Sequence, residues 1–199
     1  MDFSKFKEVT SAVASVKSQQ FVFEESKNKG LPGKFQTVTL QSIPKKENLI
    51  ILVTDKKCFD TGAFFEKPYG KRADFVLLEK KDNALHLYVV ECKSGLKFED
   101  INNKILHQIK GAIRLSKYWM LATLEAEDKT INDCLHIYPK ALVLYTSLND
   151  TSTHTTEFGN GLFERANYNK SGYFPLTVKK VEPISTHTFD DFLSYFKIA

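Results

Sequence analysis

Three charged residues near the middle of the chain have the types needed to bind a divalent cation and to act beside it: Asp74, Glu91 and Lys93. Two convergent carboxylates supply hard oxygen ligands, and Mg²⁺ takes such oxygens while keeping several waters. A backbone carbonyl, such as that of Cys92, would complete an ordinary partial shell. The residue types therefore predict a divalent cation site with a neighbouring positive charge, provided that the fold brings them together.

The surrounding sequence predicts a β-hairpin that does so. Apolar runs at 73–78 and 84–90 flank the turn-forming pair Asp82-Asn83. With those two residues in the loop, stepping outward pairs Lys81 with Ala84, Leu78 with Leu87, Val76 with Val89, and Asp74 with Glu91. The period of two along a strand adds Lys93 to the face of Glu91. Because like charges opposed across a strand pair are destabilising, a cation between them is the expected explanation.

This arrangement resembles the signature of the PD-(D/E)xK nuclease superfamily, in which an Asp and a Glu-x-Lys triplet lie on adjacent strands. Asp74 and the triplet Glu91-Cys92-Lys93 match that pattern, and Ala73 stands where the superfamily name has Pro. By element order the resemblance covers roughly residues 20 to 146. It implies a restriction-endonuclease-like α/β fold, with a central mixed β-sheet flanked by helices.

The resemblance also implies an activity, the metal-dependent hydrolysis of phosphodiester bonds. Asp74, Glu91 and the Cys92 carbonyl would hold Mg²⁺ or Mn²⁺, which lowers the pKa of a bound water and neutralises charge on the phosphate. Lys93 would orient the attacking water or stabilise the transition state. DNA is the substrate that the resemblance favours, and nothing in the residues excludes RNA.

Glu25 enters the candidate site through the resemblance alone. Many members of the superfamily place a glutamate from the first helix near the metal, and Glu25 is the candidate for that ligand. The alternative is a solvated, charged turn.

Gln108 is the polar member of an otherwise apolar helical stripe. The other members are Ile101, Ile105, Ala112, Leu115 and Trp119. A glutamine on the helix after the Glu-x-Lys strand resembles the RecB-like exonuclease branch, where it would position water or substrate. That branch usually has Tyr where this chain has Ala112. The alternative is a buried amide satisfied by the backbone.

The segment before Arg72 is long, irregular, and rich in aromatic and basic residues. Lys67, Lys71 and Arg72 are candidate contacts with a nucleic-acid backbone, while aromatic residues packed under a surface loop explain the segment equally well. The net charge of +4 permits a polyanionic partner without requiring one.

The remaining pattern predicts one domain over residues 1–199, because 199 residues suit a single core. The expected elements are an N-terminal amphipathic helix extending toward Ser26, strands at 35–43, 48–54 and 141–146, a turn at Ser94-Gly95, an edge strand at 174–181, and a helix capped by Thr188.

The spacing of the cysteines and the length of the apolar runs predict the cellular compartment of the protein. Cys58, Cys92 and Cys134 lack disulfide or zinc spacing, so they are predicted to be reduced thiols in a cytoplasmic protein. Neither a signal peptide nor a membrane span is expected.

Two other interpretations stay open. The chain is alternatively a non-catalytic module of the same fold that binds nucleic acid or protein within a larger complex, and a homodimer or partner protein would then supply specificity. In the other interpretation, Glu91 and Lys93 form an ordinary surface ion pair, which requires their face to be exposed.

Overall fold

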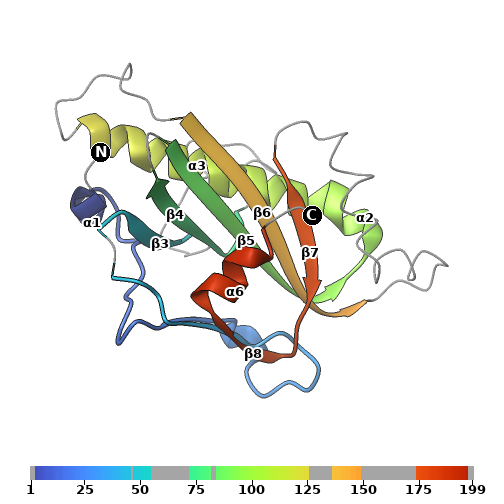
Figure 1. Cartoon of the computed structure of the whole chain (residues 1–199). Helices are drawn as coiled ribbons and strands as arrows, with labels where there is room; N and C mark the ends of the chain where they lie inside the picture. Colours follow the sequence, from blue (N-terminus) through green and yellow to red (C-terminus); the bar gives the residue numbers. More distant parts are fainter. Residues whose placement is uncertain are drawn as a thin grey trace.

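The computed structural model describes residues 3–45, 47–54, 72–81, 84–125, 136–148 and 174–196. Their strands are β1 (Phe21–Glu24), β2 (Thr37–Gln41), β3 (Leu49–Val53), β4 (Phe75–Lys81), β5 (Ala84–Leu96), β6 (His136–Leu148), β7 (Leu176–Lys180) and β8 (Ile184–Thr188). These strands form a five-stranded sheet in the order β3-β4-β5-β6-β7 and a three-stranded sheet in the order β1-β2-β8 (Figure 1). The protein is therefore a mixed α/β protein with two sheets.

The helical segments are few and one of them dominates. They are the 3₁₀ turns η1 (Phe3–Lys5) and η2 (Ser26–Asn28), the short helices α1 (Phe6–Val9) and α2 (Phe98–Asp100), the π-helical turn η3 (Ile101–Ile105), the long helix α3 (Leu106–Glu125) and the C-terminal helix α6 (Phe189–Ser194). Within the described ranges, no helix has the length and apolar character needed to cross a lipid bilayer.

The predicted register of the hairpin is confirmed along most of its length. β4 and β5 pair Lys81 with Ala84, Leu78 with Leu87, and Val76 with Val89. The turn residues Asp82 and Asn83 lie outside the described residues. At the other end the prediction is one pair too long. The ladder ends at Phe75 opposite Val90, and the Asp74 N–H donates to the Val90 carbonyl at 3.1 Å.

The predicted turn at Ser94-Gly95 is wrong, because β5 continues through both residues to Leu96. Its last residues pair in parallel with β6, ending at Leu96 opposite Leu148. Parallel neighbours need a long crossover, and α3 supplies it between β5 and β6. The glycine thus lies within a paired strand whose hydrogen bonds to β6 replace the expected turn.

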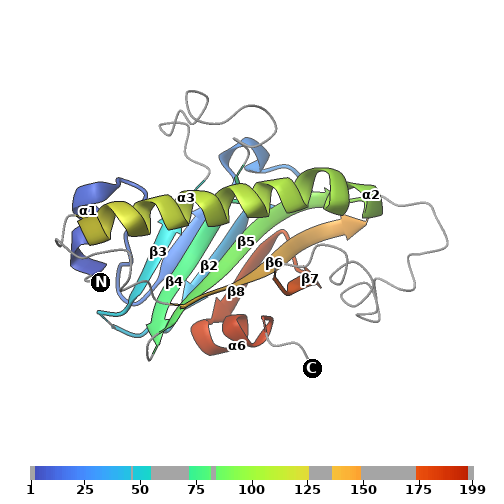
Figure 2. The ribbon, with the colours of Figure 1, turned by 90° about the horizontal axis from the view of Figure 1, so that it is seen from above.

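Both faces of the five-stranded sheet are covered, as its apolar strands require. Helix α3 lies on one side and α6 on the other (Figure 2). Val76, Leu78, Leu87 and Val89 pack into the core beneath α3. Phe75, Leu77, Val90 and Leu142 pack into a second core with α6 and the small sheet. The predicted central mixed sheet is thereby confirmed, and β7 forms one of its edges as expected.

The small sheet was not predicted. β1 pairs antiparallel with β2, and β2 pairs in parallel with β8, with Thr37 opposite Ile184. The segment 35–43 was correctly expected to contain a strand, but that strand belongs to this second sheet. The pairing joins segments more than a hundred residues apart, so no local pattern specifies it.

The predicted N-terminal helix toward Ser26 is wrong. Helix α1 ends at Val9, and Thr10 has extended dihedral angles. The Thr10 hydroxyl accepts a hydrogen bond from the Ala12 N–H at 3.1 Å, an alternative to continuing the helix. Val13 then forms an antiparallel bridge to Leu52 of β3. The helical spacing of apolar residues was misleading because these residues pack against a sheet edge.

The C-terminal cap agrees with the sequence. Thr188 precedes α6, and its hydroxyl accepts from the Asp191 N–H at 3.2 Å. The same hydroxyl donates to the Asp191 carboxylate at 2.6 Å. Asp is too short for the reciprocal bond of a full capping box, so its carboxylate binds the threonine side chain instead.

A tight turn between Lys17 and Gln20 offers a stability prediction. Their backbones exchange two hydrogen bonds, and Ser18 and Gln19 have φ of 48° and 60°. Because left-handed backbone is costly for side chains other than Gly, Gln19→Gly should raise the free energy of unfolding by about 0.5–1 kcal/mol in urea denaturation. The matched change Gln41→Gly in β2 should lower it, and equal effects would contradict the assignment.

Candidate functional site

Glu91 and Lys93 lie on the face of β5 that α3 covers. They follow Leu87 and Val89 at alternating positions, and those two residues belong to the core under α3. The Glu91 side chain is 1% exposed and forms an ion pair with Lys93, which is 29% exposed. The interpretation of Glu91 and Lys93 as a surface pair is therefore wrong. A buried carboxylate is bound to an ammonium group that still reaches solvent.

Asp74 lies immediately before β4 and is 6% exposed. Its Oδ2 accepts a hydrogen bond from the Cys92 N–H at 2.6 Å. This bond joins Asp74 to the residue between Glu91 and Lys93, so the structure brings all three charged residues predicted from the sequence together. The Cys92 side chain packs toward the opposite core, as the period of two predicts.

The backbone around Asp74 is held from two sides. On one side, the Thr54 N–H donates to the Asp74 carbonyl at 2.9 Å, and the Thr54 hydroxyl donates to the Ala73 carbonyl. On the other side, the Ala73 N–H donates to the Gln108 carbonyl at 2.9 Å. Such bonds fix the position from which the Asp74 carboxylate projects.

Gln108 therefore reaches the site, but through the backbone. Its Nε2 donates a long hydrogen bond of 3.5 Å to the Arg72 carbonyl, and its own carbonyl binds the Ala73 N–H. These contacts match the alternative of an amide satisfied by the backbone. Gln108 connects α3 to the segment leading into β4, which makes it a positioning residue for Asp74.

The charges of the site act on one another. Burial lowers the pKa of Lys93, but the charge and hydrogen bond of Glu91, together with the charge of Asp74, outweigh burial and raise it. The Lys93 ammonium is thus held in its charged form at neutral pH. Burial is also the main cause that raises the pKa of the Cys92 thiol well above its ordinary value, followed by the charges of Asp74 and Glu91.

Cys92 should consequently react slowly with thiol reagents. Only the thiolate is nucleophilic, and each unit by which the pKa rises removes about nine-tenths of the thiolate at a given pH. In a Cys58→Ser/Cys134→Ser variant, maleimide should modify Cys92 at pH 8 at least about tenfold more slowly in buffer than in urea. Equal rates of modification in buffer and in urea would contradict a buried, negatively charged environment for Cys92.

The donor set fits a hard divalent cation only as a partial shell. Asp74 and Glu91 are carboxylates, which suit Mg²⁺ or Mn²⁺ held by one or two acidic residues with water completing the shell. In the part of the chain that the structure describes, no three His, Cys, Asp or Glu side chains gather closely enough to hold a metal ion. Glu25, next to β1, is therefore not brought together with Asp74 and Glu91 as a third carboxylate.

Tyr145 is a neighbour that the sequence did not single out. It lies opposite Lys93 in the parallel register of β5 and β6, and its side chain is buried in the core under α3. Burial raises the pKa of its hydroxyl. Its place in the predicted strand 141–146 was visible, but the register between β5 and β6 was not.

The predicted nucleic-acid contacts divide into two groups. Lys67 and Lys71 lie outside the described residues. Arg72 is half-buried, and its carbonyl accepts the hydrogen bond from Gln108. Its role in binding a nucleic-acid backbone stays a prediction.

The fold and the site thus define a mixed α/β protein with a buried group of two carboxylates and a lysine. No protein-family model matches the chain. Searches of curated proteins and of solved structures likewise gave no match.

Proposed function

We propose that this protein is a metal-dependent nuclease of the PD-(D/E)xK type that hydrolyses phosphodiester bonds, with DNA as its substrate. The observation that carries the proposal is that Asp74, immediately before β4, accepts a hydrogen bond from the Cys92 N–H, while Glu91 and Lys93 on either side of Cys92 form an ion pair. A buried acidic pair with a lysine is costly to maintain for stability alone, since apolar residues of similar volume often serve as well.

Each residue has a distinct part in the proposed chemistry. Asp74 and Glu91, with the Cys92 carbonyl, would hold Mg²⁺ or Mn²⁺. The bound metal supplies Lewis acidity, which makes water a better nucleophile and offsets the charge of the phosphate. Lys93 keeps its proton because its pKa is raised, so it can donate hydrogen bonds to the attacking water or to a phosphate oxygen. Glu91 fixes the direction of Lys93 through the ion pair.

Supporting residues keep these groups in place. Thr54 and Gln108 hold the backbone on either side of Ala73, and the Cys92 N–H fixes the Asp74 carboxylate. In phosphodiester hydrolysis the protein contributes mainly by positioning the reacting groups, so the site residues must be held in place before the substrate binds. The restriction-endonuclease-like core is part of the same proposal, supported by the mixed sheet with α3 between its parallel strands β5 and β6.

One observation favours the second candidate, a non-catalytic module of the same fold. Glu91 is already paired with Lys93, and Asp74 already accepts from the Cys92 N–H. Without a metal, these contacts serve as a buried polar network that fixes the base of the hairpin. Such a module would bind nucleic acid or a protein partner and would need no metal at Asp74 and Glu91.

The two candidates are separated by metal binding and cleavage. The purified protein should degrade linear or circular DNA when Mg²⁺ or Mn²⁺ is added and should lose this activity with a chelator. Calorimetric titration with Mn²⁺ should give a saturable heat that Glu91→Gln reduces. Binding of DNA without cleavage or metal uptake would favour the non-catalytic module.

A further inference from the structure

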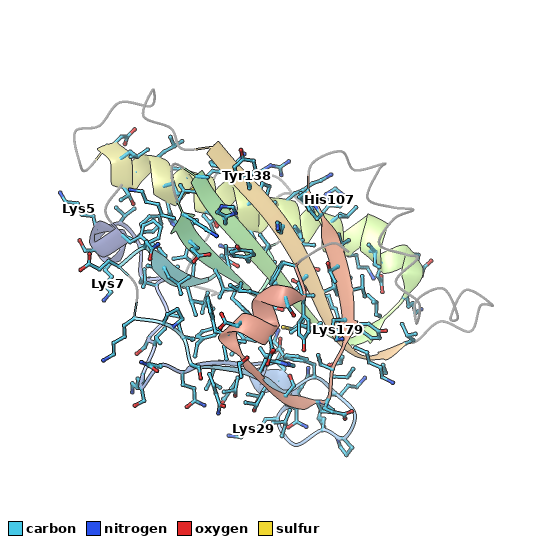
Figure 3. All side chains as sticks on the ribbon, viewed as in Figure 1. Lys5, Lys7, Lys29, His107, Tyr138 and Lys179 are labelled. Atoms are coloured by element: carbon cyan, nitrogen blue, oxygen red, sulfur yellow. The ribbon has the colours of Figure 1, made fainter. Side chains whose placement is uncertain are left out.

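A pocket of about 430 Å³ lies beside β3, away from the acidic residues described above. Its walls come from three parts of the chain: the N-terminal segment, the residues before β3, and β3 itself. Lys7 belongs to α1 at the margin of the molecule (Figure 3), and Lys45 precedes β3. Most of the other lining side chains are apolar, among them Val16, which is 42% exposed.

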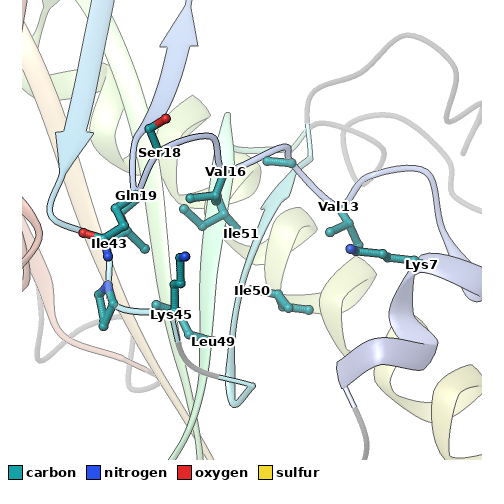
Figure 4. A pocket seen from close by; sticks show the side chains of 12 residues that line it. Lys7, Val13, Val16, Ser18, Gln19, Ile43, Lys45, Leu49, Ile50 and Ile51 are labelled. Carbon is teal, nitrogen blue, oxygen red and sulfur yellow. The ribbon is translucent and has the colours of Figure 1, made fainter.

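The two lysines extend into this pocket from opposite ends. Figure 4 shows Lys45 turned toward Val16 and Ile51, with Lys7 and Val13 at the other end. Among the described residues, neither ammonium group has an acidic partner. An apolar pocket between two such cations fits a ligand with apolar and negatively charged groups.

The backbone of β3 adds a requirement for the shape of that ligand. β3 is an edge strand, and the Ile51 carbonyl accepts from the Ala14 N–H at 2.8 Å, while the Val53 N–H donates to the Ala12 carbonyl at 2.9 Å. These residues direct their polar groups away from β4. Leu49, two residues earlier, directs its N–H and carbonyl the same way.

The outer edge of β3 is only partly used. The N-terminal segment leaves the edge after Ala14 and makes its own turn between Lys17 and Gln20. Within the described part of the chain, no hydrogen bond to the outward backbone groups of Leu49 occurs. The outward N–H and carbonyl of Leu49 can therefore pair with an added strand.

We propose that this pocket binds an extended acidic peptide of a partner protein, which adds as a short strand to the open edge of β3. Side chains of an added strand alternate between the two faces of the sheet. One face presents Ile50 and Val13 near Lys7, and the other presents Leu49 near Lys45, with the buried Ile51 beneath it. The best ligand therefore has a central apolar pair flanked on both sides by acidic pairs.

The peptide Glu-Glu-Ile-Val-Glu-Glu, labelled with fluorescein, is a suitable probe for fluorescence anisotropy. Binding should be saturable and should weaken as salt is added, because lysine–carboxylate attraction is screened. Lys7→Glu and Lys45→Glu should each weaken binding by roughly tenfold, since each replaces attraction by like-charge repulsion. Lys29→Glu, a matched change on an exposed lysine outside the pocket, should leave binding unchanged.

A second probe tests the strand itself with the protein unaltered. N-methylation of both the Ile and the Val amide nitrogens removes the peptide donor that faces β3 in either register and should weaken binding as strongly as a lysine reversal. Equal binding of the methylated peptide, or equal effects of Lys29→Glu and Lys45→Glu, overturns the proposal. If laurate binds saturably and the peptide does not bind, the proposal is overturned. It is also overturned if the peptide does not bind and the protein instead self-associates in a way that Lys45→Glu abolishes.

Discussion

Replacing Asp74 by asparagine should abolish metal-dependent cleavage of DNA while leaving the fold intact. Loss of one carboxylate ligand removes several kcal/mol of transition-state stabilisation, which corresponds to a rate at least about a hundredfold lower. The structure favours asparagine over alanine. Asparagine keeps an oxygen that accepts from the Cys92 N–H, whereas Asp74→Ala leaves that amide without its partner, at a cost of about 1–3 kcal/mol.

The measurement is the initial rate of cleavage in Mg²⁺ and in Mn²⁺, with circular dichroism to compare the folds. Asp190→Asn, the same substitution at an exposed position of α6, is the matched control and should cleave at the unaltered rate. If Asp74→Asn and Asp190→Asn cleave equally well, Asp74 has no catalytic role. If neither variant nor the unaltered protein cleaves any nucleic acid, the non-catalytic module is the better description.

Replacing Lys93 by methionine should be the most destabilising single change at this site. Methionine keeps much of the side-chain volume but removes the Lys93 ammonium from the buried Glu91 carboxylate. Removal of one partner from a buried ion pair costs about 3–5 kcal/mol, and the 29% exposure of Lys93 reduces the expected loss to about 2–3 kcal/mol. The free energy of unfolding from urea denaturation at neutral pH measures it.

The same pair predicts a dependence on alkaline pH. Since the pKa of Lys93 in the folded protein lies above its ordinary value of 10.5, its stabilising effect is fully present below pH 10.5. The effect is lost as pH rises through the folded-state pKa. The stability difference between the unaltered protein and Lys93→Met should therefore shrink in strongly alkaline buffer. A difference that stays constant would mean that the lost stability comes from packing.

Lys104→Met provides a matched control for charge removal. Lys104 pairs with Asp100 at 2.7 Å on the helix surface, and its side chain is 63% exposed. Surface pairs of this kind contribute less than about 0.5 kcal/mol. If Lys104→Met lowers the free energy of unfolding as much as Lys93→Met does, the distinction between buried and exposed ion pairs is contradicted. Lys93→Met will also lower cleavage if the nuclease proposal is correct, so stability and activity need separate assays.

Several features could be predicted from the sequence because local physical rules specify them. The register of β4 and β5 followed from strand periodicity, since a slip of one residue would turn every apolar side chain to the other face. The apolar stripe along η3 and α3 followed from helical spacing, and its apolar members are buried as expected. Thr188 followed from the preference of hydroxyl residues for helix N-termini.

Other features depended on contacts between distant segments. The spacing of Phe3, Phe6, Thr10 and Val13 suits a helix. The edge of β3, however, offered Ala12 and Ala14 backbone partners that a helix there would have excluded. The small sheet needs β8 beside β2, and the pocket beside β3 exists only because the N-terminal segment leaves that edge after Ala14. Such pairings carry no local signal.

Asp74, Glu91 and Lys93 show most clearly which features follow from the local sequence and which depend on tertiary contacts. The sequence alone places Glu91 and Lys93 on one face of a strand, because the period of two depends only on the backbone, but it extended the pairing to Asp74, which lies just before β4. The tertiary structure decided that α3 covers that face, that Glu91 pairs with Lys93, and that Asp74 is held by the Cys92 N–H. Burial and pairing set the charge states of these groups, because both depend on the distance to every surrounding charge and to solvent.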